Sequence, residues 1–168
     1  GGDLRFGETG AGAGLRGADK LCATIAERSM QGAGQKGWRA FLSVGADENG
    51  NQVNAIDRLG AGPWYDRLGR VVATSKSELL ADRPTAADSA IRNDLPNEDG
   101  TPNSRPSGTS VDNHDMLTGS TTAGVLTSAS ATCSDWTSTT ASSKPRVGHA
   151  FPRASGSGTE AVNWMSSH

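Results

Sequence analysis

Five arginines and one adjacent aromatic pair are the side chains of this sequence best suited to holding an anionic ligand. The arginines are Arg16, Arg39, Arg58, Arg67 and Arg70, and the aromatic pair is Trp64 and Tyr65. A guanidinium group presents a planar fork of donors that matches sulfate and carboxylate groups, and the aromatic pair could line a ligand groove. The competing interpretation is that the arginines are ordinary solvated charges and that the aromatics belong to a small core.

Two cysteines, Cys22 and Cys133, are the other residues with chemical potential. They could pair with each other across a very long loop if the fold brings them close enough. They could also remain buried thiols that pack as small hydrophobic groups. Small loop-rich domains often depend on disulfides, but the residues alone leave both possibilities open.

Motifs of the common enzyme and metal-site classes are missing from the sequence. The nearest approach to a nucleophile elbow, Gly108–Asp112, lacks the final glycine, and no zinc-protease, phosphate-loop or dinucleotide motif occurs. The stretch Asp47–Gln52 suggests a calcium loop, but Gln52 and Arg58 stand where an EF-hand needs Gly and Glu. A turn at Asn49-Gly50 is the better prediction. We therefore expect no enzymatic activity, no metal site and no cofactor.

The composition indicates one domain with a small core. A chain of 168 residues is long enough for a single domain, and its 22 glycines and few aliphatic residues predict a loop-rich fold. The net charge of -2, with both signs mixed along the chain, argues against a nucleic-acid surface. No apolar run is long enough to cross a bilayer. The N-terminus has no secretory leader, so we expect a mature or processed product.

Hydrophobic periodicity predicts a helix followed directly by a strand near the N-terminus. Small and apolar residues recur at helical spacing from Cys22 to Met30, with Asp19 as the expected N-cap. Glycines after Met30 then end the helix. Side chains alternate from Trp38 to Ser43, which is typical of a strand. Residues 1–16 are expected to form a Gly-rich arm or a first edge strand ahead of this pair.

Later segments give further signals. Val71–Thr74 has strand composition, and Ser75 with Glu78 forms a capping box for a short helix that ends at Pro84. Residues 85–113 form a long polar excursion, either a binding loop or a flexible insertion. Within the Ser/Thr-rich residues 118–143, the Cys and Trp of residues 132–138 resemble part of a core strand.

Several short blocks, taken together and in order, carry a family resemblance. They are Arg16–Asp19, Cys22, Arg39–Ser43, Asn54–Arg58, Gly62–Asp66, Leu117–Ser120 and Cys133–Ser138. These blocks resemble the endostatin domain of collagens and the bacterial endostatin-like proteins, which have a C-type-lectin-like fold. The resemblance implies an α+β domain over residues 17–168, with two helices, small antiparallel sheets and long loops.

The resemblance also implies what this chain lacks. The family has four cysteines in nested pairs, and Cys22 and Cys133 match the first and second. Both would then be half-cystines whose partners lie beyond His168, so we expect a domain without its closing strands. A second chain would supply those strands, or processing would have removed them. The zinc ligands of endostatin lie near its N-terminus, whereas His114, His149 and His168 all lie in the second half here.

These inferences favour a secreted or cell-surface binding module without enzymatic activity. The resemblance implies adhesion to a glycan, the matrix or a surface protein, with the five arginines and the aromatic pair as contacts. The first alternative is a structural subunit of an extracellular assembly, completed by strand addition. The second is an enzyme whose site is assembled from distant loops and leaves no local motif.

Overall fold

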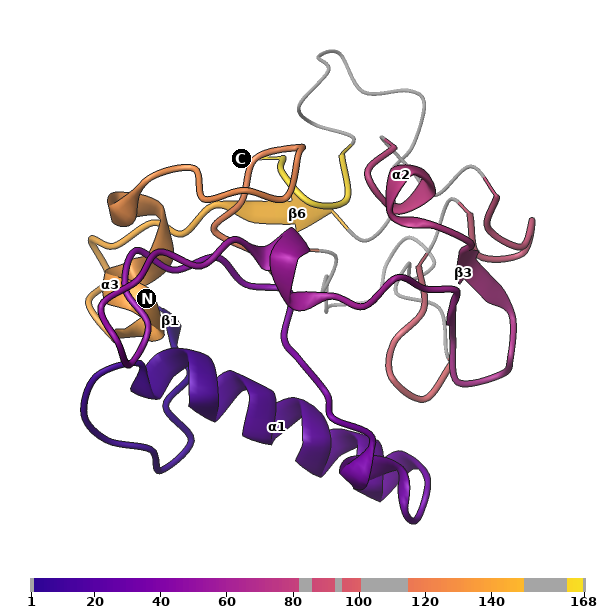
Figure 1. The fold of residues 1–168 in the computed structure, drawn as a ribbon, viewed down its shortest axis with the longest axis horizontal. Coiled ribbons are helices and arrows are strands. Elements are labelled where there is room, and N and C mark those ends of the chain that lie inside the picture. The colour runs from indigo at the N-terminus through magenta and orange to yellow at the C-terminus, as the bar shows by residue number, and fades with distance from the viewer. Residues whose placement is uncertain (1, 82–85, 93–94, 101–114, 150–162, 168) are drawn as a thin grey trace, which may run out of the picture. The chain divides into compact units, whose positions relative to one another are not determined.

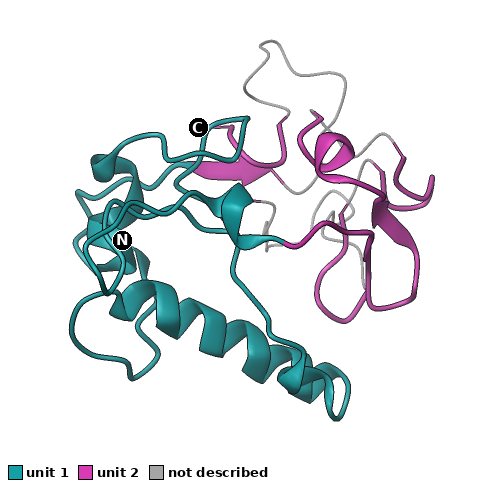
Figure 2. Cartoon of the chain, viewed as in Figure 1, with its two compact units in different colours: residues 1–59, 117–146 teal, residues 60–116, 147–168 magenta. Residues whose placement is uncertain are grey.

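The computed structural model describes residues 2–81, 86–92, 95–100, 115–149 and 163–167. Within these residues there are three α-helices, three 3-10 helices and three two-stranded sheets (Figure 1). The α+β class predicted from the sequence is therefore confirmed. The contacts divide the chain into two compact units (Figure 2). Unit 1 comprises residues 1–59 and 117–146, and unit 2 comprises residues 60–116 and 147–168.

Unit 1 is built around one long helix, α1 (Ala13–Ser29). Its other helical elements are short: η1 (Ala33–Gln35), η2 (Ala55–Arg58), η3 (Ala129–Thr132) and α3 (Cys133–Trp136). β1 (Gly2–Asp3) pairs antiparallel with β5 (Thr137–Ser138). The residues expected as an N-terminal arm therefore include both an edge strand and the first turn of α1.

α1 begins earlier than the sequence predicts. It starts at Ala13, so Asp19, the expected N-cap, lies inside the helix. Most of its buried residues lie in the first two turns, while Met30, expected on the buried face, is 40% exposed. Periodicity missed this start because the glycines and alanines of the first turns carry little hydrophobic signal.

Two glycines in α1 allow other main-chain segments to pack directly on the helix. A Cβ atom on Gly14 would overlap the main chain of residues 135–136, and a Cβ atom on Gly17 would overlap the carbonyl oxygens of residues 4–5. Glycine weakens a helix interior by about 1 kcal/mol relative to alanine. Here the close packing offsets that cost, because no larger residue would permit it.

The core of unit 1 surrounds a tryptophan. Trp136 is fully buried and packs with other buried apolar residues, namely Leu15, Ala18, Leu42 and Val44. Its indole Nε1 donates a 2.9 Å hydrogen bond to the carbonyl oxygen of Ser43. The polar atom of the ring is therefore satisfied inside the core, and the prediction that this tryptophan is a core residue is confirmed.

The strand predicted at Trp38–Ser43 is absent. The backbone groups of this segment are bound by separate partners instead of a strand ladder. The Ala40 N–H donates to the Asp19 carboxylate at 2.9 Å, and the Ser43 N–H donates to the Thr118 carbonyl oxygen at 2.9 Å. The predicted alternation of two faces is also wrong, because Trp38 and Arg39 are both exposed while Leu42 and Ser43 are both buried.

The core strand predicted within residues 132–138 is wrong for its first part. Residues 133–136 form a single turn with φ between 49° and 65°, the left-handed region. L-residues avoid this region because Cβ approaches the following carbonyl oxygen, so the turn requires support from its surroundings. The Asp135 carboxylate supplies some of it by accepting the Gly45 N–H at 2.7 Å. The strand begins only at Thr137, as β5.

The remaining elements include a hairpin and a capped helical turn. β2 (Trp64–Tyr65) pairs antiparallel with β3 (Val71–Ala73), which confirms the predicted strand. In α2 (Lys76–Leu79) the side chain of Ser75 accepts a hydrogen bond from the Glu78 N–H, as the predicted capping box requires. The third sheet pairs β4 (Asp115–Leu117) with β6 (Val147–His149).

The predicted polar excursion is described only in part. Residues 85, 93–94 and 101–113 lie outside the described residues, as does Pro84, the expected end of the helix. The described parts include the buried apolar residues Ala87, Ile91 and Leu95. This portion of the excursion therefore contributes to the interior of unit 2.

The packing of Gly17 predicts that replacing this helical glycine with alanine changes the free energy of unfolding in the opposite direction to the usual one. Gly17→Ala is expected to destabilise the protein by about 2 kcal/mol, because the new methyl group must displace main chain. In an exposed helix interior the same change stabilises by up to about 1 kcal/mol. Gly60→Ala is the control, since no described atom lies within 4 Å of the position of a Cβ atom on Gly60, and its effect should stay within about 0.5 kcal/mol. Urea unfolding measures both, and a stabilised Gly17→Ala variant would contradict the packing.

Candidate functional site

The seven residues predicted as ligand contacts divide between the two units. Unit 1 holds Arg16, Arg39 and Arg58, and unit 2 holds Trp64, Tyr65, Arg67 and Arg70. Each group is a separate candidate surface, and we describe each within its own unit.

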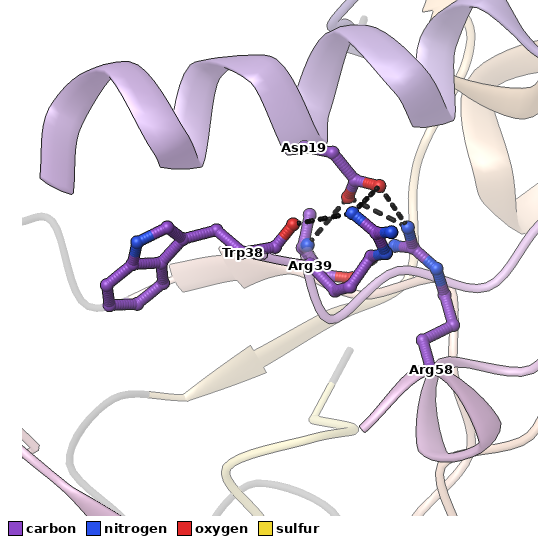
Figure 3. A network of polar contacts seen from close by, with 5 residues as sticks. Asp19, Trp38, Arg39 and Arg58 are labelled. Atoms are coloured by element: carbon purple, nitrogen blue, oxygen red, sulfur yellow. Dashed lines mark hydrogen bonds and ion pairs between the residues drawn. The ribbon is translucent and has the colours of Figure 1, made fainter. Parts of the chain in front are cut away.

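In unit 1 the Asp19 carboxylate gathers two of the arginines (Figure 3). Arg58 Nη2 donates to both carboxylate oxygens, at 2.8 and 2.6 Å, and Arg58 Nη1 donates to the Ala40 carbonyl oxygen. The Arg58 side chain is 8% exposed and that of Asp19 is 18% exposed. This ion pair is therefore largely shielded from water and satisfied by hydrogen bonds.

Arg39 meets the same carboxylate at a longer distance. Its Nη1 atom lies 3.7 Å from Asp19 Oδ2, too far for a hydrogen bond, and donates to the Trp38 carbonyl oxygen at 3.1 Å. The Arg39 side chain is 55% exposed. Because Arg58 already balances the charge of Asp19, the cluster holds one more positive than negative charge. That surplus charge lies on the exposed guanidinium group of Arg39.

Trp38 is a second exposed side chain of this region, and sequence reasoning missed it as a contact. It is 43% exposed, and its indole Nε1 donates a 2.7 Å hydrogen bond to the Ala33 carbonyl oxygen in η1. Figure 3 shows the ring extending away from Asp19, whereas the guanidinium groups of Arg39 and Arg58 face that carboxylate. Trp38 and Arg39 together form what we name the Trp38–Arg39 surface. The signal for it was an aromatic directly beside a predicted arginine contact.

A shallow groove of about 450 Å³ runs along α1 and η1 in the same unit. Two cationic side chains, Lys20 and Arg28, lie along it, and Lys20 Nζ donates to Glu8 Oε1 at 3.1 Å. Glu27, which also lines the groove, is bound by main chain of the same unit. The Gly32 and Gly34 N–H groups donate to its carboxylate at 2.9 and 3.0 Å, and these bonds lower the pKa of Glu27. The groove and the Trp38 indole share η1, so they belong to one region of unit 1.

Arg16 is used inside the chain. Its Nη1 donates to the Ala11 carbonyl oxygen at 2.6 Å, its Nη2 donates to the Thr9 carbonyl oxygen at 2.8 Å, and its Nε lies 3.5 Å from Glu8 Oε2. The guanidinium group thus closes the loop before α1. A ligand would have to displace these bonds to reach it.

Arg70 has a similar internal role in unit 2. Its Nε donates to Asp66 Oδ2 at 2.6 Å and its Nη2 donates to the Gly100 carbonyl oxygen at 3.2 Å. The Asp66 carboxylate also accepts the N–H groups of Leu68 and Arg70, at 2.9 and 2.8 Å. Burial acts to raise the pKa of Asp66, but these hydrogen bonds and the Arg70 charge outweigh it and lower the pKa. The pair fixes the turn between β2 and β3.

The β2–β3 turn displays the other predicted contacts of unit 2. Tyr65 is 58% exposed and Arg67 is also exposed, while Trp64 is half-buried. Leu68, at 61% exposed, was not predicted, because a single leucine among polar residues gives no signal. The turn therefore presents an aromatic, a cationic and an aliphatic side chain on a fixed backbone.

The two cysteines are free thiols and are not bonded to each other. Cys133 is buried, and Cys22 is half-buried one helical turn after Asp19. Burial raises the pKa of the Cys22 thiol, the charge of Asp19 raises it further, and the charge of Arg58 opposes both. Their predicted roles as half-cystines stay a prediction.

Within the described part of the chain, no group of three His, Cys, Asp or Glu side chains converges in a way that could hold a metal ion. No helix in the same residues has the length and apolar character needed to span a membrane. Of the histidines, His114 and His168 lie outside the described residues.

The buried pair predicts a strong and specific effect on stability. Arg58→Met is expected to lower the free energy of unfolding by about 3 kcal/mol, because the Asp19 carboxylate loses its charged partner while shielded from water. Asp19→Asn combined with Arg58→Met should recover part of the loss, since neither charge is then unpaired. Arg5→Ala, which breaks the exposed Asp3–Arg5 pair, is the control and should have little effect. Urea unfolding of all three variants tests this, and equal losses in Arg58→Met and Arg5→Ala would contradict it.

Comparison of the chain with protein-family models, with curated proteins and with solved structures gave no match. The endostatin resemblance therefore stays a prediction from the sequence blocks.

Proposed function

We propose that this chain is a non-enzymatic binding module, secreted or held at a cell surface, that recognises an anionic group on a glycan, a matrix component or a surface protein. The observation that carries the proposal is the surplus positive charge on Arg39. The sulfate and carboxylate groups of extracellular polymers are the natural partners of an exposed guanidinium. The C-type-lectin-like fold belongs to the same proposal and is supported by the α+β class.

The position of Arg39 suits it to binding. A guanidinium group carries five N–H donors, and Arg39 makes a single hydrogen bond within the described residues, to the Trp38 carbonyl oxygen. The next residue, Ala40, is held on both sides, by Asp19 through its N–H and by Arg58 through its carbonyl oxygen. The backbone that carries Arg39 is therefore ordered before a ligand arrives, which lowers the entropic cost of binding.

The surroundings of Arg39 favour an extended ligand over a single small ion. The Trp38 ring offers an apolar face on which a sugar ring can pack, and it extends away from the Asp19 cluster (Figure 3). The groove along α1 adds the cation Arg28, whereas Lys20 on the same groove is already paired with Glu8. A small ion would engage Arg39 alone, whereas an oligosaccharide could also reach the indole and the groove.

Binding to sulfated, carboxylated and neutral oligosaccharides of equal length tests the proposal. Arg39→Ala is expected to weaken binding of the anionic ligands by about tenfold or more, because hydrogen bonds to charged groups contribute about 1.5–3 kcal/mol. Arg39→Lys should recover part of the affinity, since lysine keeps the charge but lacks the planar fork. Affinity should also fall as salt concentration rises.

The matched control is Arg5→Ala, which removes the same charge from unit 1 at a residue outside the Trp38–Arg39 surface. It should leave binding unchanged. Equal losses in the two variants would show that net charge, not the Trp38–Arg39 surface, governs binding. Equal affinity for neutral and anionic ligands, or no binding to any of them, would overturn the proposal.

One observation favours assembly by strand addition as a second candidate function. Every sheet within the described residues has two strands. The outer edges of β3 and β6 already bind main chain, of Asp88 and of residues 163–167, so an added strand would have to use an edge that these bonds leave open, such as that of β2. Unpaired edges can accept a strand from another chain. A subunit of an extracellular assembly would use them in this way.

Sedimentation velocity at increasing protein concentration tests the assembly candidate. Assembly by strand addition predicts a sedimentation coefficient that rises with concentration, together with a gain in β signal in far-ultraviolet circular dichroism, because new ladders form. A chain that stays monomeric at the highest soluble concentration would eliminate this candidate. Association without a gain in β signal would point to contacts between side chains and would also count against strand addition.

A further inference from the structure

The chain contains a single Asn-Gly pair, Asn49-Gly50, and it lies in a turn of unit 1. Both residues are exposed. Gly50 has φ of 82°, and no described atom lies within 4 Å of the position that a Cβ atom on it would occupy. Residue 50 therefore has no side chain that hinders the approach of its nitrogen to the side chain of Asn49.

We propose that Asn49 is a site of spontaneous deamidation and that the Asp47 carboxylate sets its rate. This modification needs water alone as co-reactant. It goes beyond the proposed binding function and does not depend on it.

The reaction proceeds in two balanced steps. The Gly50 backbone nitrogen loses its proton to solvent and attacks Asn49 Cγ, forming a new N–Cγ bond. Nδ2 takes up a proton from solvent, the bond between Cγ and Nδ2 breaks, and ammonia leaves, so a five-membered succinimide ring remains. Water then adds to one of the two ring carbonyls. Opening on one side gives aspartate at position 49, and opening on the other gives isoaspartate.

Hydrogen bonds around Asp47 oppose the first step in the folded chain. The Gly50 N–H donates to the Asp47 carbonyl oxygen at 3.1 Å, and this bond must break before the nitrogen can attack. Asp47 Oδ1 accepts the N–H groups of Asn49 and Asn51, at 2.8 and 2.9 Å, which holds the turn closed. Bonds from Asn51 and Asn49 lower the pKa of Asp47, so its carboxylate stays charged at neutral pH. The reaction rate therefore follows how often this turn opens.

The product changes unit 1 near the start of α1. A carboxylate at position 49 would stand beside Asp47 and Glu48, and such like charges repel. Isoaspartate would also add one carbon to the main chain inside the turn, so the bonds around Asp47 could not all persist. The Glu48 backbone nitrogen lies against Gly12, the N-cap of α1. A distortion of the turn would therefore arise next to the beginning of this helix.

Incubation of the folded chain in neutral buffer, followed by peptide mapping by mass spectrometry, tests the proposal. We expect the peptide that contains Asn49 to gain the mass difference between an amide and an acid, while Asn51 and Asn54 stay unchanged. The same chain unfolded in urea should react faster at Asn49. Asp47→Ala should raise the rate of deamidation at Asn49 in the folded chain several-fold, because it removes the side-chain acceptor that holds the turn closed.

Glu48→Ala is the matched control, since it removes a neighbouring carboxylate for which the structure shows no hydrogen bond within the turn. Its rate should equal that of the unaltered chain. Circular dichroism verifies that the variants are folded. The proposal is overturned if Asn49 stays an amide in the folded chain after the unfolded chain has converted completely. It is also overturned if Asp47→Ala and Glu48→Ala react at the same rate.

Discussion

The organisation of unit 1 depends on the ion pair and hydrogen bonds that the Asp19 carboxylate makes. This residue lies inside α1 and binds the main chain of Ala40 and the side chain of Arg58 in η2. Three segments that are distant in sequence are thus held by one charged group shielded from water. Arg39 stays exposed because Arg58 already neutralises the charge of the Asp19 carboxylate, so a second cation gains little by approaching it closely.

Close main-chain packing compensates for the scarcity of large apolar residues. The core of unit 1 has one tryptophan and few aliphatic side chains, so side-chain burial provides a limited part of its stability. Gly14 and Gly17 let residues 135–136 and 4–5 lie directly against α1. Contacts between backbones at this distance gain dispersion energy without a large side chain.

Local signals in the sequence predicted local structure well. The capping box at Ser75 and the turn at Asn49-Gly50 were correct, because each depends on residues within a few positions of one another. The predictions were wrong for the start of α1, for the 38–43 segment and for the turn at 133–136. The conformations of these segments depend on partners far along the chain. Asp135 and Gly45, for example, are 90 residues apart.

The same distinction holds for the candidate site. Residue type marked the arginines, but it could not separate Arg58, which is buried in an ion pair, from Arg39, which is exposed. Arg16 and Arg70 proved to be bound internally by carbonyl and carboxylate oxygens. Those partners are set by tertiary contacts, and no spacing rule in the sequence reveals them.

The left-handed turn at 133–136 is the point where three parts of unit 1 meet. Its backbone lies in a region that L-residues avoid, so the turn depends on contacts made elsewhere in the unit. The Leu4 N–H donates to the Trp136 carbonyl oxygen, and the Gly45 N–H donates to the Asp135 carboxylate. Loss of either the first residues or the middle of the unit would therefore leave this unfavourable backbone with less support.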